Sequence, residues 1–173
     1  MLVMLLPAVQ PLEGKEASTG GEILRSSLAG LNLERVYLSV DTDHKYHDTI
    51  RDRVIRAFNK HGLKLSENEL YKQGQILLKL TVRPDPIKGG GSGNVLYYKK
   101  LELFENVISE RSPKIKTWAV TWSFGIPNPI LSGTISIDQL ERDADELIGG
   151  FIQDFLFTNG KGETNTRELE KQR

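Results

Sequence analysis

Apolar residues recur along this chain with two different periods, and these periods predict its secondary structure. Alternation of apolar and polar residues predicts a strand with one buried face, whereas apolar residues three and four positions apart predict an amphipathic helix. The periods follow one another in the order β-α-β-β-β-α. This order predicts an α+β domain, a two-layer sandwich in which two helices cover one face of a mostly antiparallel four-stranded sheet.

The first strand and the first helix are predicted early in the chain. Residues 36–40 alternate, with Val36, Leu38 and Val40 on one side, as in a half-buried strand. An apolar stripe with helical spacing then comprises Tyr46, Ile50, Val54, Ala57 and Phe58. We expect this helix to end at Gly62, because glycine readily adopts the left-handed conformation that terminates helices.

Three further strands are predicted in the middle of the chain, over residues 75–82, 95–108 and 115–124. Pro84 and Pro86 are expected to end the first of them, because proline lacks the N–H that a β-ladder needs. One face of the last strand is predicted to carry Trp118, Val120, Trp122 and Phe124.

The last element is predicted to be a long helix. Its start is capped by Ser136 with Gln139, or by Asp138 with Glu141. Its broad apolar face comprises Leu140, Ala144, Leu147, Ile148, Phe151, Ile152, Phe155 and Leu156. The Gly149-Gly150 pair costs about 1 kcal/mol per glycine relative to alanine, so we expect a close crossing over the sheet at this point.

The folded domain is expected to cover residues 33–158. Residues 1–32 are interpreted as a clipped signal segment with a linker, and 159–173 as a flexible polar tail. Within the domain, the glycine-rich residues 89–94 and the proline-containing residues 125–133 are expected to form loops.

Composition narrows the classes of function. Among the 173 residues, 23 Lys and Arg balance 23 Asp and Glu, so we expect no nucleic-acid partner, which would favour a basic excess. The chain has no Cys, which excludes disulfides, thiolate metal ligands and catalytic thiols. No apolar run approaches the roughly 18 residues of a membrane-spanning helix, so we expect no transmembrane span.

The chain begins with a short apolar run, Met1–Val9. Such a run is typical of the core of an export signal, although the basic start and a clean cleavage site are missing. We therefore expect a periplasmic or otherwise extracytoplasmic protein. The alternative is a cytoplasmic protein-interaction subunit in which these residues pack as a strand or form a tail.

One cluster of polar residues has the side chains of a metal site. Asp41, Asp43, His44 and His47 carry carboxylates and imidazoles that can bind a divalent metal, which would make the protein a metal-dependent hydrolase. The favoured interpretation is structural, because aspartate caps helix starts and acidic residues stabilise them. We expect no metal and no other cofactor.

Two other groups are assigned to structure rather than to chemistry. The aromatic residues of the middle strands are Tyr97, Tyr98, Trp118 and Trp122. Stacking on single-stranded nucleic acid is one role for such residues, but the zero net charge favours a core face that meets the helices. Asp143 and Glu146 are expected on the solvent-exposed side of the last helix.

The element order resembles that of small bacterial envelope proteins. The stretches that carry the resemblance are residues 36–40, 62–65, 118–122 and 147–155. They are similar to the lipoprotein that plugs the lipopolysaccharide-inserting barrel, and to related transport-auxiliary lipoproteins. The resemblance implies a non-enzymatic protein with an outer-membrane or envelope partner. This chain departs from that class because it has no Cys to carry a lipid.

These patterns together predict a non-catalytic binding or assembly module. We expect it to dock a protein or lipid-containing partner through the sheet face opposite the helices and through the glycine-rich loop. The expected contact residues are Lys79, Thr81, Gly90, Ser92, Asn94, Lys99, Lys100, Thr117 and Thr121.

Overall fold

The computed structural model describes residues 27–66, 70–72, 74–87, 93–109 and 111–160. The predicted order β-α-β-β-β-α is confirmed, with one short strand added before the last helix. The elements are η1 (Leu33–Arg35), β1 (Val36–Asp41), η2 (His44–Tyr46), α2 (His47–Lys60), β2 (Ile76–Pro86), β3 (Val95–Ser109), β4 (Ser112–Gly125), β5 (Ile130–Ser132) and α3 (Ile137–Thr158).

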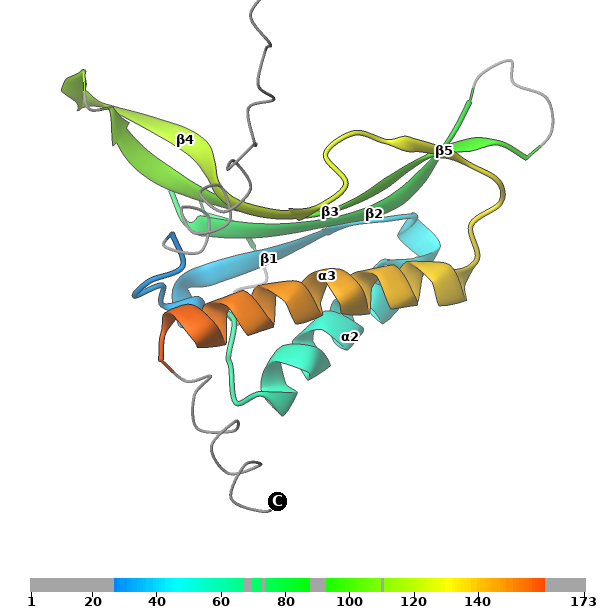
Figure 1. Cartoon of the computed structure of the whole chain (residues 1–173), viewed down its shortest axis with the longest axis horizontal. Coiled ribbons are helices and arrows are strands. Elements are labelled where there is room, and N and C mark those ends of the chain that lie inside the picture. Colours follow the sequence, from blue (N-terminus) through cyan, green and yellow to red (C-terminus); the bar gives the residue numbers. More distant parts are fainter. Residues whose placement is uncertain (1–26, 67–69, 73, 88–92, 110, 161–173) are drawn as a thin grey trace, which may run out of the picture.

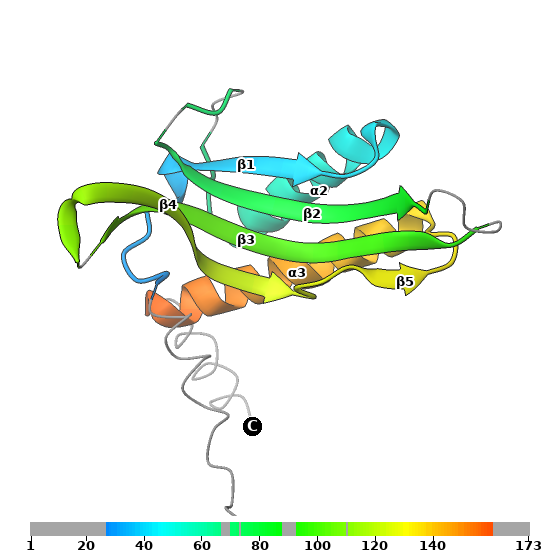
Figure 2. The ribbon, with the colours of Figure 1, turned by 90° about the horizontal axis from the view of Figure 1, so that it is seen from above.

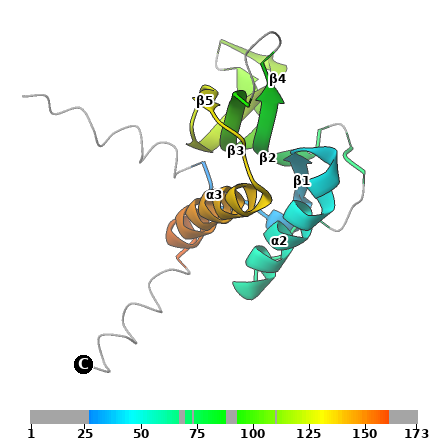
Figure 3. The ribbon, with the colours of Figure 1, turned by 90° about the vertical axis from the view of Figure 1, so that its right-hand side faces the viewer.

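The fold has two layers, as the sequence predicts (Figure 1). The sheet has the order β1-β2-β3-β4, with β1 and β2 parallel and the other neighbours antiparallel. Both α2 and α3 lie against the same side of the sheet (Figure 3). We call this side the helix face and the other side the open face.

The core lies between the sheet and the two helices. On β2 and β3 the cross-strand pairs Leu78–Leu103 and Leu80–Leu101 are fully buried. Phe58 of α2 and Phe151 of α3 meet above them, with ring centroids 5.7 Å apart. Alternate apolar side chains on the strands therefore pack against the apolar stripes of both helices.

The prediction that Pro84 and Pro86 end their strand is wrong, because β2 runs through Pro86. β1 pairs with β2 only as far as Asp41 opposite Thr81, whereas β3 accompanies β2 to its end. Beyond Thr81 one edge of β2 has no strand partner among the described residues. Proline is tolerated where its missing N–H faces such an edge.

A β-bulge makes the prediction for the aromatic strand wrong as well. Leu103 of β3 pairs with Trp122, but the next residue, Phe104, pairs with Val120, so Thr121 is the extra residue. Leu103 and Phe104 point to opposite faces, and their partners do so too. Trp122 and Phe124 therefore lie on the helix face, whereas Trp118 and Val120 lie on the open face.

Residues 125–133 were expected to form only a loop, but they contain β5, which pairs with the start of β3. The chain leaves β4 at Gly125, where φ is +111° and a Cβ would lie 2.6 Å from the Lys99 carbonyl oxygen. Only glycine fits this turn. The three residues of β5 are too few for an alternation that a sequence pattern could detect.

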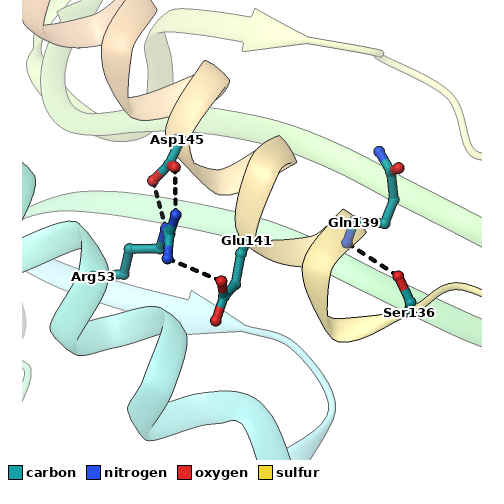
Figure 4. Close-up of polar contacts among 5 residues, drawn as sticks. All are labelled: Arg53, Ser136, Gln139, Glu141 and Asp145. Carbon is teal, nitrogen blue, oxygen red and sulfur yellow. Dashed lines mark hydrogen bonds and ion pairs between the residues drawn. The ribbon is translucent and has the colours of Figure 1, made fainter.

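The start of α3 agrees with prediction, since the Ser136 hydroxyl accepts a hydrogen bond of 3.2 Å from the Gln139 backbone N–H (Figure 4). The close crossing is confirmed at Gly150, where a Cβ would lie 2.7 Å from the Phe124 ring. At Gly149 nothing lies within 4 Å of that position.

One arginine links the two helices. Arg53 of α2 donates to both carboxylate oxygens of Asp145 at 2.7 and 2.8 Å and to Glu141 at 2.9 Å (Figure 4). A bidentate contact of this kind fixes the orientation of the two side chains, and with them the packing of α2 beside α3.

The packed part of the chain begins before the expected residue 33, because Leu28 is fully buried in the core. The Asn159 side chain holds it there by donating to the Leu28 carbonyl oxygen and accepting from the Gly30 N–H. Over the described residues, none of the helices has the length and apolar character needed to cross a membrane.

Candidate functional site: the open face and the β3–β4 hairpin

The middle of the open face carries charges that pair with one another. Asp41 at the end of β1 lies 3.0 Å from Arg83 and 3.5 Å from Lys79. Arg83 also contacts Asp85 at 2.9 Å, and Lys100 contacts Glu102 at 3.0 Å. These pairs lie at the surface, where each contributes little to stability and is screened by salt.

Three of the expected contact residues, Lys79, Thr81 and Lys100, do lie on the open face. Thr81 is only 3% exposed, and its hydroxyl has no hydrogen-bond partner among the described residues. The two lysines are held by Asp41 and Glu102. Their role in binding stays a prediction, and a partner would have to compete with these internal ion pairs.

The expectation that Lys99 lies on the open face is wrong. Lys99 points to the helix face, where its ammonium lies 2.8 Å from Asp143 and 2.6 Å from Glu146 of α3. Asp143 is 4% exposed, so it does not lie on a solvated side of α3 as expected. It also accepts hydrogen bonds from the Tyr97 hydroxyl at 2.6 Å and the Gln139 amide at 2.9 Å.

This buried cluster shifts the titration of its members. Burial is the largest influence on Asp143 and by itself raises the pKa, but the bonds from Lys99, Tyr97 and Gln139 together hold the pKa below its usual value. Burial alone would lower the pKa of Lys99, yet the bonds to Asp143 and Glu146 raise it. The cluster therefore holds a charged pair that fastens α3 to β3.

The remaining expected contact residues are scattered. Thr117 is exposed, but it pairs with Val107 and lies on the side opposite Trp118. The Thr121 hydroxyl donates to Glu105 at 2.6 Å within the bulge. Asn94 is exposed beside β3. Gly90 and Ser92 lie outside the described residues.

The structure does not gather the four candidate metal ligands. Asp41 is paired with Arg83 and Lys79, while Asp43 caps η2 by accepting from the Lys45 N–H. His47 contacts Asp48 instead. No group of three or more metal-ligating side chains occurs among the described residues.

A cluster of aromatic rings occupies one end of the open face. Tyr71, from the connection before β2, lies 5.6 Å from Tyr37 and 6.1 Å from Trp118, measured between ring centroids. Trp118 in turn stacks on Phe104 at 6.2 Å. We call these four residues the aromatic cluster. The sequence pattern does not predict the aromatic cluster, because the bulge that brings Trp118 to this face has no simple sequence signal.

The aromatic cluster continues into a hairpin that extends past the helical layer (Figure 2). We call residues 104–109 and 112–120, with their turn, the projecting hairpin. Large apolar side chains are exposed along it, with Ile108 at 60%, Ile115 at 57% and Val120 at 45%. Ile108 and Val120 lie on the open face, whereas Ile115 lies on the opposite side of the hairpin. Exposed large apolar side chains of this kind are typical of interaction sites.

β4, whose first part belongs to the projecting hairpin, forms one edge of the sheet. It pairs with β3 along one side, while β5 pairs with β3 and not with β4. No described strand pairs with the outer side of β4. A long edge strand with exposed apolar side chains offers its free N–H and C=O groups to another extended segment.

Comparison with known proteins identifies no relative: no protein-family model, curated protein or solved structure matches the chain.

Proposed function

We propose that the protein is a non-catalytic docking module that binds an extended segment of a partner protein along β4. The observation that carries this proposal is the exposed apolar edge of the projecting hairpin. Addition of a strand to a sheet edge uses main-chain hydrogen bonds for affinity and side-chain pockets for specificity. The proposal moves the expected docking surface from the middle of the open face to its hairpin end.

The internal ion pairs support this choice of location. In the middle of the open face, Asp41 and Glu102 already neutralise the neighbouring cations. On the projecting hairpin, Ile108, Trp118 and Val120 are left in contact with solvent. A partner that covers the apolar side chains of the projecting hairpin gains hydrophobic free energy. A partner that covers the middle of the open face must instead desolvate charges that are already paired, which is unfavourable.

The charge of the projecting hairpin indicates what the partner segment carries. Arg111, Lys114 and Lys116 lie near its turn, and none of the three forms an ion pair with another described residue. A complementary segment is therefore apolar where it meets Val120 and acidic where it passes the turn. Complementary charge raises the rate and the specificity of such an encounter.

A placement in the cell envelope is a second, separate part of the proposal. Its support is the apolar run Met1–Val9 and the resemblance in element order described above. Cell fractionation of the native protein, with N-terminal sequencing, tests it. Recovery in the cytoplasmic fraction with Met1 retained would contradict the envelope placement without affecting the docking surface.

Site-specific photo-crosslinking tests the docking surface. A photo-reactive amino acid at Val120 should give a discrete adduct with one protein, and mass spectrometry should locate the crosslink in an extended segment that is apolar at the crosslinked position and acidic farther along. Leu131 in β5 is the matched control, because it is 66% exposed but lies at the other end of the sheet. Equal adducts from both positions would contradict the proposal.

Two further measurements separate other occupants of the same surface. Sedimentation with vesicles of anionic and of neutral phospholipid tests whether the hairpin binds a lipid surface instead. Light scattering over a range of concentrations tests whether β4 pairs with a second copy of the chain. If the protein binds anionic vesicles, and Val120→Lys abolishes this binding while Leu131→Lys does not, the occupant of β4 is a lipid surface rather than a partner protein. If the same two variants affect dimerisation in this way, the occupant is a second copy of the chain.

A further inference from the structure

A separate cavity lies at the opposite edge of the sheet, between α2 and the segment that follows it. Its volume is about 270 Å³. The segment is held beside β1 by a hydrogen bond of 3.1 Å from the Ser66 N–H to the Val36 carbonyl oxygen. Since β1 and β4 are opposite ends of the strand order β1-β2-β3-β4, this cavity is independent of the projecting hairpin.

The cavity has an apolar floor. Ile55 and Phe58 line it from α2, and Leu65 lines it from the following segment. Phe58 is 1% exposed and belongs to the core, while Ile55 and Leu65 are partly buried and pack against it. An alkyl group that entered the cavity would therefore contact an apolar surface and leave water.

Two cations complete the lining. Arg51 lies one turn before Ile55 on the same side of α2, and Lys64 enters from the following segment. Neither side chain forms an ion pair or a hydrogen bond with another described residue. This contrasts with Arg53, which donates hydrogen bonds to Asp145 and Glu141 of α3.

Neither acidic neighbour of Arg51 on α2, Asp48 or Asp52, forms an ion pair with it. Asp48, three residues before Arg51, makes its ion pair with His47 at 3.0 Å and is 98% exposed. The lining of the cavity itself contains no carboxylate, since its polar members besides the cations are Asn59 and Ser66. The cavity thus combines an apolar floor with two cations that form no ion pair with another described residue.

We propose that this cavity binds a small amphiphilic anion. A short alkyl chain lies on Ile55, Phe58 and Leu65, and a carboxylate or phosphate group contacts Arg51 and Lys64. The attraction between these cations and an anion is stronger here than in bulk water, because the apolar floor keeps water away from one side of the contact. The volume lies just under the usual range of small-molecule sites, which limits the ligand to a short chain.

Titration of the full chain with octanoate tests the proposal by calorimetry and by NMR chemical shifts. We expect a dissociation constant near or below about 1 mM, with shifts centred on α2 and residues 63–66. Acetate, inorganic phosphate and octanol each carry only part of the required chemistry, so each should bind at least about ten-fold more weakly. Octyl phosphate in parallel distinguishes the two anionic groups, and tight binding of either supports the site.

Matched substitutions test whether Arg51 and Lys64 bind the anionic group. Arg51→Gln and Lys64→Gln should each weaken octanoate binding roughly ten-fold, since each removes one charge-assisted contact. Arg56→Gln removes an exposed cation of the same helix outside the cavity and should change nothing. Val120→Lys in the projecting hairpin should also leave octanoate binding unchanged, which keeps this site separable from the proposed docking function.

Several results would overturn the proposal. The site is absent if octanoate gives no shifts up to about 10 mM, well above the expected dissociation constant. Shifts centred on the projecting hairpin place the ligand elsewhere. If octanol binds as tightly as octanoate, the cations do not contribute to binding. If inorganic phosphate binds as tightly as octanoate, the apolar floor does not contribute.

Discussion

The two ends of β4 experience different environments although they belong to one strand. Trp122, near its end, is 1% exposed and lies edge-on against Phe151 of α3 at 5.0 Å between ring centroids. Trp118, four residues earlier, is 37% exposed; it stacks on Phe104 and lies edge-on against Tyr71. The same residue type therefore serves the core at one end and a surface at the other.

The bulge at Thr121 separates these two ends. Without it, Trp118 and Trp122 would share one face, as the alternation of the sequence suggests. The extra residue redirects the first half of β4 to the open face, and the Thr121 hydroxyl fixes the geometry by donating to Glu105. Bulges often redirect side chains near functional sites, which agrees with the docking surface proposed here.

The two tryptophans give the largest expected contrast. Trp122→Ala should lower the free energy of unfolding by about 4 kcal/mol, because it leaves a cavity beneath α3. Trp118→Ala should cost less, about 1–2 kcal/mol, since 37% of the residue is exposed and it lies outside the core between the sheet and the helices. Urea unfolding measures both values. Similar losses for the two variants would show that the hairpin end is part of the core.

The buried charged cluster is the next test, since it fastens the helix layer to β3. Asp143→Ala should lower the free energy of unfolding by about 3 kcal/mol, because it leaves Lys99 without its buried partner. Glu146→Ala removes the more exposed partner of the same lysine and should cost less than about 1 kcal/mol. Equal losses in urea unfolding would contradict the assignment of Asp143 as the buried anchor.

The same cluster predicts a pH dependence. Because the pKa of Asp143 is lowered by folding, its contribution is complete above the ordinary aspartate pKa of about 4 and is lost as the pH falls further. Because the pKa of Lys99 is raised, its contribution is complete below the ordinary lysine pKa of about 10.4 and is lost at higher pH. Unfolding curves for Asp143→Asn should lack much of the acid loss seen in the unsubstituted protein.

The two adjacent glycines of α3 give a smaller effect. Gly149→Ala should stabilise the protein by up to about 1 kcal/mol, because its Cβ enters open space and alanine favours helix. Gly150→Ala should be about 1–3 kcal/mol less stable than Gly149→Ala, since its Cβ meets the Phe124 ring. Equal stability of the two variants in urea unfolding would contradict the close crossing.

The smallest change in the free energy of unfolding is expected for a substitution on the projecting hairpin. Val120→Lys should change the free energy of unfolding by less than about 0.5 kcal/mol, because the side chain remains in solvent. The same change should abolish the crosslinked adduct formed from a photo-reactive residue at Trp118. Retention of that adduct, with stability unchanged, would show that the partner does not pair along this edge.

Local patterns in the sequence were enough to determine the helices, most of the strands and the layer architecture. The stripe from Ile50 to Phe58 and the cap at Ser136 depend on neighbours three or four residues away, so the chain encodes them directly. The helix-facing residues of β1 and β2 follow from simple alternation for the same reason.

Tertiary pairing decided which residues form the candidate docking surface and the buried charged cluster. The bulge opposite Leu103, the strand β5 and the burial of Asp143 by Lys99 and Tyr97 arise from contacts between segments far apart in sequence. Such contacts depend on register, and a shift of one residue moves a side chain to the other face. For that reason the sequence pattern predicts Trp118 in the core and Lys99 on the open face, while the folded chain places each on the opposite side.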